Sequence, residues 1–316
     1  MDDPSIVIRT LALPAVLLLM ALEAVWLMRL RRQAYPWREA AASLGIAIGN
    51  RLTQAAAPLL LAPVYLLAWE YRVATVPLDT WWGLAALFLA VELAYYWMHR
   101  LSHECRWLWA THSVHHSPRH LNLTAAYRLG WTNLISGQWL FWLPLIVVGF
   151  HPVAVFTMLA VNLLYQFWLH TELVPRLGPL EWLLNTPSHH RVHHATNPAY
   201  LDRNYGGVLI VFDRLFGSVA AERADTPCRY GLVRQIDSHN PFAIAFNEWR
   251  GILRDLRHAD GWRSRLGFAF GPPGWSPDGS RETTASIRAS ASRRASCRRR
   301  PGSATGRPGR RGGLAC

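Results

Sequence analysis

The sequence predicts an all-α fold, an integral membrane helical bundle that carries a histidine-rich helical cap on its cytosolic side. The chain of 316 residues is 51% hydrophobic and only 17% charged, and its apolar residues fall into long runs separated by arginines. Aromatic residues include 16 tryptophans, which is typical of proteins with many membrane–water interfaces. Twelve of the 14 histidines lie between residues 99 and 194, so the polar chemistry is concentrated in one third of the chain.

The first three apolar runs cover residues 10–28, 52–69 and 80–98. A helix over residues 10–28 rises about 1.5 Å per residue and therefore covers roughly 28 Å, close to the thickness of a bilayer core. No small-residue cleavage site follows a short apolar core there, so we expect a retained membrane helix rather than a removed signal peptide. The third run continues without a break into the first histidines.

Two further apolar runs, residues 131–150 and 152–169, meet at a Gly-Phe-His-Pro turn. Proline cannot continue a helix from the preceding turn, and glycine favours a break. We therefore expect a membrane hairpin whose tip lies at residues 149–152.

Arginine placement predicts the orientation of these helices. The loop at residues 29–38 carries four arginines and should be cytoplasmic. Counting crossings from that loop returns residues 99–130 and the chain from 170 onward to the cytoplasm, and both segments are also arginine-rich. Every histidine cluster then lies on one side of the membrane, which we expect to be the cytoplasmic side of a bacterial inner membrane.

The chain divides into four predicted parts. Residues 1–79 form N-terminal membrane helices, and residues 80–221 form the membrane hairpin and the histidine-rich domain. Residues 222–275 form a cytosolic extension, in which 243–257 is an amphipathic helix that packs on the cap or lies on the bilayer surface. Residues 276–316 contain 10 arginines and no aromatic residue, so we expect disorder there.

The net charge of +13 does not indicate nucleic-acid binding. Residues 276–316 carry 10 arginines against 2 acidic residues, a charge of +8, which leaves only +5 for the rest of the chain. All the basic residues are arginine, which indicates the codon bias of a GC-rich genome. We therefore expect no nucleic-acid partner.

Three histidine clusters have the spacing of metal ligands. His99 and His103 are four residues apart, and the motif HSVHH at 112–116 repeats the offsets i, i+3, i+4. The motif HHRVHH at 189–194 contains the same offsets. Such offsets place the rings on one face of a helix, and neutral imidazole is the commonest metal ligand in proteins.

His170 stands alone in sequence but ends a polar stripe. Asn162, Gln166 and His170 are spaced four apart on an otherwise apolar helix, where polar groups cost free energy unless they face a site or a partner. Nine or ten imidazoles exceed the four to six ligands of a single ion, so the number indicates two metal ions. Nitrogen-rich ligation suits iron, zinc or copper.

These motifs resemble those of a known family. HRLSH, HSVHH and HHRVHH, in this order and separated by a hydrophobic hairpin, are similar to the histidine boxes of the fatty acid hydroxylase/sterol desaturase superfamily of membrane di-iron oxygenases. The stretches NLTAAYR, NTPSHHRVHHATNP, LDRNYGG and FDRLFGS resemble the branch that contains alkylglycerol monooxygenase and bacterial sterol-desaturase-like proteins.

The resemblance, which covers residues 80–260, implies a lipid C–H oxidoreductase. Its expected cofactors are two iron ions, with dioxygen as co-substrate and electrons from a separate reductase protein. Its expected substrate is a membrane lipid, which is hydroxylated or desaturated. Carried over by position, the metal ligands are His99, His103, His112, His115, His116, His190, His193 and His194. To these we add His170, which matches an additional histidine of some members, and His189, which adjoins the last box and is either a ligand or a residue that supports one.

The other polar residues have weaker assignments. We expect no ligand role for the remaining histidines, which are His120, His151, His239 and His258. Glu92 lies two helical turns from His99 on the same face and either tunes a ligand, orients substrate or is a paired structural carboxylate. Asp202, Asn204 and Asp213 either accept imidazole N–H bonds or stabilise turns and caps.

Two other classes of protein remain open from the residues alone. The same imidazoles would serve a zinc-dependent membrane lipid hydrolase, which needs no electrons. A metal transporter is the other class, but it predicts ligands strung through the bilayer, whereas these clusters lie mostly in polar segments.

Overall fold

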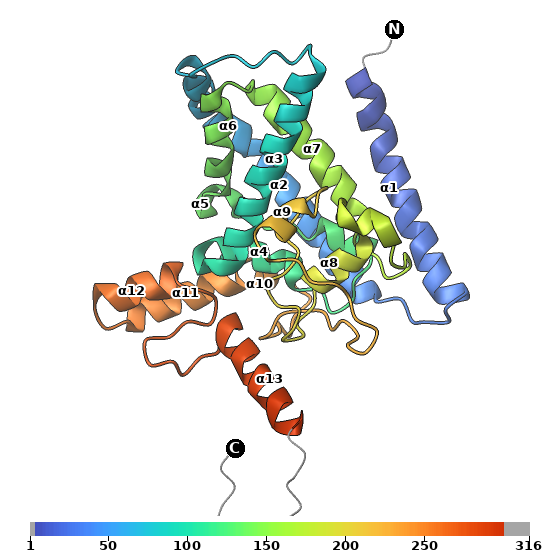
Figure 1. The fold of residues 1–316 in the computed structure, drawn as a ribbon, viewed down its shortest axis with the longest axis vertical. Helices are drawn as coiled ribbons and strands as arrows, with labels where there is room; N and C mark the ends of the chain where they lie inside the picture. The colour runs from blue at the N-terminus through green and yellow to red at the C-terminus, as the bar shows by residue number, and fades with distance from the viewer. Residues whose placement is uncertain (1–3, 300–316) are drawn as a thin grey trace, which may run out of the picture.

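A computed structural model describes the backbone of residues 4–299 and the side chains of residues 14–294. Within that part of the chain every named element is a helix, and the only β-type pairing consists of three isolated bridges. The all-α prediction is therefore confirmed for the described residues. Figure 1 shows an upper group of long helices above a lower layer of short helices and loops.

Three long helices cover the first three apolar runs: α1 (Pro4–Arg29), α2 (Trp37–Glu70) and α3 (Trp81–Glu104). Both α2 and α3 are long and apolar enough to cross a membrane. The Thr80 hydroxyl caps α3 by accepting a hydrogen bond from the Gly83 N–H at 3.2 Å. α3 extends past its apolar run and carries the first two histidines in its last two turns.

The hairpin has its turn at residues 149–151, between α6 and α7, as the sequence predicts. Its first arm, however, is not one continuous helix. Residues 131–150 instead form three short pieces, α5 (Asn133–Ser136), η2 (Gln138–Trp142) and α6 (Leu143–Val148). Gly137 has a φ of 81°, a left-handed conformation that interrupts the helix between α5 and η2. The second arm, α7 (Pro152–Phe167), is continuous.

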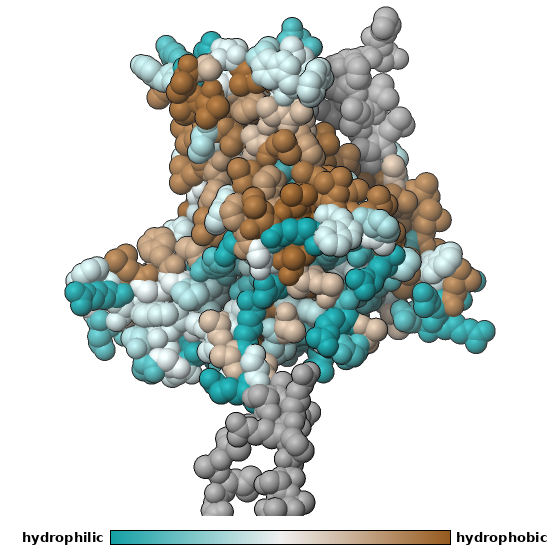
Figure 2. Space-filling model, viewed as in Figure 1, coloured by the Kyte–Doolittle hydropathy of each residue, from teal (hydrophilic) through white to brown (hydrophobic). Residues whose placement is uncertain are grey.

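The upper helices share one apolar core. α2, α3, α6 and α7 contribute its fully buried side chains, among which Val91, Ile146 and Val155 are 0% exposed. The outward faces are apolar as well, since Leu59 of α2 is 79% exposed and Val153 of α7 is 67% exposed. Figure 2 shows a hydrophobic band across the upper helices, with hydrophilic residues at their upper ends and over the lower half of the molecule. This distribution is typical of a membrane protein, in which lipid contacts the outward apolar side chains.

The lower layer holds the polar segments. Its helices are α4 (Arg106–His116), η1 (Leu123–Tyr127), η3 (Gly178–Trp182), α8 (Pro187–His193), α9 (Val211–Leu215), α10 (Pro241–Ala245), α11 (Asn247–His258) and α12 (Gly261–Phe270). α4 is the central element, because it packs against α3 above it and against α11 and α12 beside it. The amphipathic segment at 243–257 is interrupted at Phe246, between α10 and α11.

The predicted disorder of residues 276–316 disagrees with the described part of that segment. Helix α13 spans Thr284–Arg299, and its residues include neither proline nor glycine, so nothing in the sequence stops a helix there. Arg281, just before α13, donates two hydrogen bonds to Asp255 of α11 at 2.6 and 2.8 Å. Residues 300–316 lie outside the described residues.

Candidate metal centre

Four elements bring the predicted histidines together. α3 carries His99 and His103, and α4 carries the HSVHH cluster on its inner face. α8 carries the HHRVHH cluster, with His194 as its C-terminal cap residue. His170 lies in the turn that follows α7. The helical spacing predicted for all three clusters is therefore confirmed.

Nine of the ten predicted ligands fall into two groups. In each group the candidate ligand atoms all lie within 4.8 Å of one another. The first group consists of five imidazoles, which are His99, His103, His112, His116 and His193. The second group consists of four, which are His115, His170, His190 and His194. Hence α4 and α8 each contribute to both groups.

The distances between ring nitrogens fit metal ligation. In the first group, His112 Nε2 lies 3.0 Å from His99 Nε2 and 3.1 Å from His116 Nε2. In the second group, His190 Nε2 lies 3.0 Å from the Nε2 atoms of both His170 and His194. Two nitrogens that bind one ion at about 2.1 Å with a right angle between them are also about 3.0 Å apart.

Partners on the far side of several rings fix which nitrogen faces inward. The Nδ1 atoms of His99, His193 and His170 contact the backbone carbonyls of Tyr205, Arg203 and Gln166 at 2.8, 2.9 and 2.9 Å. A carbonyl only accepts, so Nδ1 must carry the proton, and in the neutral ring Nε2 then presents a bare lone pair. In metal-binding histidines the ring nitrogen that does not bind the ion usually donates its N–H to such a carbonyl or to a carboxylate.

His103 has the same arrangement with a carboxylate. Its Nδ1 lies 3.3 Å from Asp202 Oδ1, and its Nε2 is buried without a hydrogen-bond partner. The Nε2 of His193 is also buried without a partner. Unpartnered buried polar atoms are rare in native structures, and an ion would satisfy both. The residues present therefore fit two metal ions.

Burial keeps four imidazoles of the two groups, His112, His116, His170 and His194, in the neutral form. It lowers the pKa of His112, His116 and His194 well below the ordinary value, and repulsion between neighbouring imidazoles lowers each pKa further. Burial likewise lowers the pKa of His170 to about 4. Neutral imidazole is the form that binds metal, so the lone pairs are available at pH 7.

His189 does not join either group. It is buried, but its Nδ1 lies 3.5 Å from the Thr186 hydroxyl, and its carbonyl accepts a hydrogen bond from Asn204. His189 is four residues from His193, so its helical offset alone does not exclude it from the group. The prediction placed it among the ligands because it adjoins the box, whereas in the structure its ring lies against Thr186.

The four histidines expected to be non-ligands lie outside both imidazole groups. His120 Nδ1 lies 3.2 Å from the Glu39 carboxylate. His151 caps α7 by accepting a hydrogen bond from the Val153 N–H at 3.3 Å. His258 donates to the Arg254 carbonyl at 2.8 Å. His239 lines a cavity away from both imidazole groups.

A chain of buried side chains links the upper helices to the site. Tyr95 donates to Gln166, Gln166 donates to Asn162, and Asn162 donates to Glu92. The other oxygen of Glu92 accepts hydrogen bonds from the Val208 and Leu209 N–H groups at 2.9 and 2.8 Å. Glu92 therefore anchors the loop at 204–209, the loop whose Tyr205 carbonyl orients His99.

The acidic and amide residues after the last histidine box play different roles. Asp202 accepts from an imidazole, as one of the two interpretations predicted. Asn204 instead bridges the His189 and Ala220 carbonyls, and Asp213 accepts hydrogen bonds from Tyr205 N–H, Gly206 N–H and the Ser218 hydroxyl. Both therefore stabilise the loop rather than contact the imidazoles.

Sequence reasoning missed Tyr205. Its ring lies 5.3 Å from the His103 ring and 5.9 Å from the His99 ring, and its hydroxyl is buried without a partner. It lines a cavity of about 280 Å³ together with His103, Asp202 and Arg288. A single tyrosine carries no spacing signal, so only the fold could bring it to the site.

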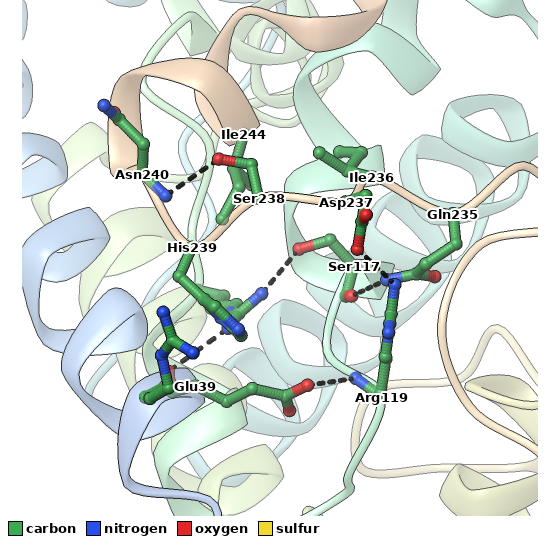
Figure 3. Close-up of a pocket in the computed structure, with 12 residues that line it drawn as sticks. Glu39, Ser117, Arg119, Gln235, Ile236, Asp237, Ser238, His239, Asn240 and Ile244 are labelled. Atoms are coloured by element: carbon green, nitrogen blue, oxygen red, sulfur yellow. Dashed lines mark hydrogen bonds and ion pairs between the residues drawn. The ribbon is translucent and has the colours of Figure 1, made fainter.

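A second cavity, of about 470 Å³, lies at the start of α2 beyond the end of α4. Figure 3 shows Glu39 in its wall, where the carboxylate accepts a hydrogen bond from the Arg119 N–H. The buried Arg128 also lines it and donates to the hydroxyls of Ser43 and Ser117. None of the nine grouped imidazoles lines this cavity, so it is separate from the metal centre.

Comparisons with known proteins agree with this centre. The model of the family described as fatty acid hydroxylase matches residues 84–218, which contain all nine grouped histidines. The chain is 40% identical to alkylglycerol monooxygenase of Xenopus tropicalis over 237 residues, 74% of this chain and 52% of that protein. It is 41% identical to alkylglycerol monooxygenase of Homo sapiens over 215 residues, 67% of this chain and 47% of that protein.

A bacterial relative is more distant. Ornithine lipid hydroxylase OlsE of Rhizobium tropici is 34% identical over 128 residues, 40% of this chain and 38% of that protein. No solved structure matches the chain. The chain spans about half the length of the alkylglycerol monooxygenases it matches.

Proposed function

Because the chain belongs to the fatty acid hydroxylase family, we propose that it is a membrane-bound di-iron oxygenase that hydroxylates or desaturates a lipid C–H bond. The observation that carries this proposal is the pair of adjacent imidazole groups, one of five rings and one of four. Each group offers enough nitrogen ligands for one ion, and nitrogen-rich ligation suits iron. Dioxygen is the co-substrate, and a separate protein supplies the electrons.

The two irons, when bound, supply the activation of dioxygen. The imidazoles hold the ions, and the carbonyls of Tyr205, Arg203 and Gln166 orient three of the rings. For hydroxylation, one oxygen atom enters the lipid and the other leaves as water, which consumes two electrons and two protons. The cavity beside His103 offers a polar approach to the first group, because Asp202 and Arg288 line it.

The lipid reaches the site from the hydrophobic half of the molecule. We propose a multi-pass arrangement in which the upper helices cross a bacterial inner membrane and the histidines lie on the cytoplasmic side. The arginines of the loop between α1 and α2 support this orientation. A substrate held in the bilayer fits ligands that lie just below membrane helices.

The substrate class is a fatty acyl, sterol-like or ether lipid. The matched relatives are named for alkylglycerols and for an ornithine lipid, both of which carry long alkyl chains. An alkyl C–H bond in such a chain has no polar group for recognition. Its position must therefore be set by the shape of an apolar slot next to the ions.

Metal analysis combined with dioxygen uptake tests this proposal. Protein purified aerobically should contain about two irons per chain, and the reduced protein should consume dioxygen when its lipid is added. Lipid profiling of a deletion strain against its complemented strain should show one class of lipid that gains or loses oxygen or a double bond. Zinc in place of iron, together with hydrolysis that needs no dioxygen, would instead establish the lipid hydrolase.

A further inference from the structure

An exposed apolar stripe runs along α12. Trp262, Leu266 and Phe270 are 66%, 49% and 53% exposed. Their spacing of four residues places them on one side of the helix. Phe268 and Ala269 point inward and are buried. A stripe of three large apolar side chains in water is unfavourable, so the position of α12 requires an apolar neighbour.

The surroundings of the stripe are strongly basic. Five arginines of α11 and α12 are exposed, and these are Arg250, Arg254, Arg257, Arg263 and Arg265. The guanidinium group of Arg263 lies over the Trp262 ring, 5.4 Å from its centroid. Two of the nearby carboxylates are already neutralised, because Arg106 binds Glu248 at 2.6 Å and Asp255 at 2.7 Å. Arg281 binds Asp255 as well. The exposed charge of the α11–α12 arm is therefore positive.

The apolar stripe is continuous with the hydrophobic half of the molecule. The Phe270 ring lies 5.5 Å from the Trp107 ring, and Trp107 donates a hydrogen bond to the Ile135 carbonyl at 3.2 Å. Ile135 of α5 is 60% exposed, and Leu140 of η2, further along, is 49% exposed. Figure 1 shows α11 and α12 projecting sideways at the foot of the upper helices. Figure 2 shows hydrophobic residues on the upper edge of this projection.

We propose that the α11–α12 arm lies on the surface of the bilayer that the upper helices cross, on the side of the histidine domain. Trp262, Leu266 and Phe270 enter the boundary between headgroups and acyl chains, and the exposed arginines of the arm bind anionic phosphate groups. Tryptophan is enriched at this depth, and basic residues around an apolar face are typical of interfacial helices. The occupant of the surface is an anionic phospholipid leaflet.

A measurement of label depth in the 316-residue chain tests whether the arm lies on the bilayer. The protein is prepared without its native cysteines and reconstituted into lipid nanodiscs of phosphatidylcholine, with or without about one third phosphatidylglycerol. A nitroxide label is attached through Leu266→Cys, and in a matched control through Asp278→Cys, an exposed position in the loop after α12. Collision of the label with dioxygen, relative to collision with a water-soluble nickel chelate, reports depth in the bilayer.

The proposal expects the Leu266→Cys label to be at least several-fold more accessible to dioxygen relative to nickel than the Asp278→Cys label. It also expects a greater depth in the anionic discs, and this gain should be lost when the five arginines are replaced by glutamine. Equal aqueous exposure of both labels in both lipids would overturn it. Dipolar broadening between Leu266→Cys labels would also overturn it, because a second copy of the chain would then cover the stripe.

This test does not depend on the oxygenase. Both labelled positions are exposed, and an unchanged elution volume and melting temperature check that the chain still folds. An arm on the bilayer with no iron in the protein would uphold this inference and contradict the proposed function. An iron-containing protein whose arm stays in water would contradict this inference and leave the proposed function standing.

Discussion

His116 and His194 stack with their ring centroids 4.4 Å apart and an angle of 24° between the rings. The first belongs to the group of five imidazoles and the second to the group of four. The two groups therefore meet through a direct ring contact rather than through a layer of other side chains. Such contact makes them two halves of one centre.

Removing one imidazole from either group should lower the metal content. His170→Ala leaves three rings in the second group, and His103→Ala leaves four in the first. We expect His170→Ala to reduce bound iron from about two to about one per chain and His103→Ala to have a smaller effect, because four ligands still suffice for an ion. Elemental analysis of the purified proteins measures this, with His151→Ala as the control. Two tightly held irons in His170→Ala would contradict the assignment of the second group.

Replacing Glu92 by glutamine should loosen the loop at 204–209. Glu92 Oε2 accepts two backbone N–H bonds there, and a glutamine has only one oxygen for these donors and for Asn162. Leaving a buried donor unpaired costs about 1–3 kcal/mol. We expect a lower melting temperature and weaker iron retention during dialysis against a chelator. Glu70→Gln, at the end of α2, is the matched control and should change neither.

Gly207→Ala should be destabilising because the loop packs directly on α7. A Cβ at this position would overlap the Asn162 side chain. Forcing an extra methyl group into a packed site costs about 1–3 kcal/mol. The double variant Gly207→Ala/Asn162→Ala makes room for the methyl group, so its loss of melting temperature should be smaller than the sum of the two single losses. Strict additivity would show that the two residues are not in contact.

The contact between His120 and Glu39 should stabilise the protein only at lower pH. The hydrogen bond that the His120 ring donates to the Glu39 carboxylate raises the pKa of His120 above its ordinary value. A raised pKa in the folded state means that the stabilisation is fully present below the unfolded pKa of about 6.5 and is lost as the pH rises through the folded value. His120→Gln should therefore lower the melting temperature at pH 6 and have little effect at pH 9. The side chain of His120 is 59% exposed, so the effect should stay below about 1 kcal/mol. An equal loss at both pH values would contradict the charge dependence.

The sequence predicts the ligand helices well because their signal is local. Offsets of three and four residues within HSVHH fix which rings share a face, whatever the helix packs against. The polar stripe of Asn162, Gln166 and His170 likewise predicts that His170 faces inward. The division of the nine rings into groups of five and four has no such signal, since α4 sends His112 and His116 to one group and His115 to the other.

The failures of prediction have physical reasons as well. Residues 131–150 have the hydropathy of a membrane helix, but hydropathy does not register the left-handed Gly137 that divides the segment. The composition around α13 predicts disorder, yet the pairing of Arg281 with the buried Asp255 ties the start of this segment to α11. The sequence does not predict that Tyr205 lies beside His103, because this contact depends on how the 204–209 loop packs.

Three of the imidazoles are aimed by main-chain carbonyl groups, those of Tyr205, Arg203 and Gln166. A carbonyl is present whatever amino acid occupies the position. The orientation of these rings therefore depends on the path of the backbone and not on which side chains occupy the three positions. A substitution that leaves the backbone path unchanged at these positions therefore keeps the carbonyl that orients each ring, and only the side-chain contacts, such as those of Gln166 with Tyr95 and Asn162, are lost.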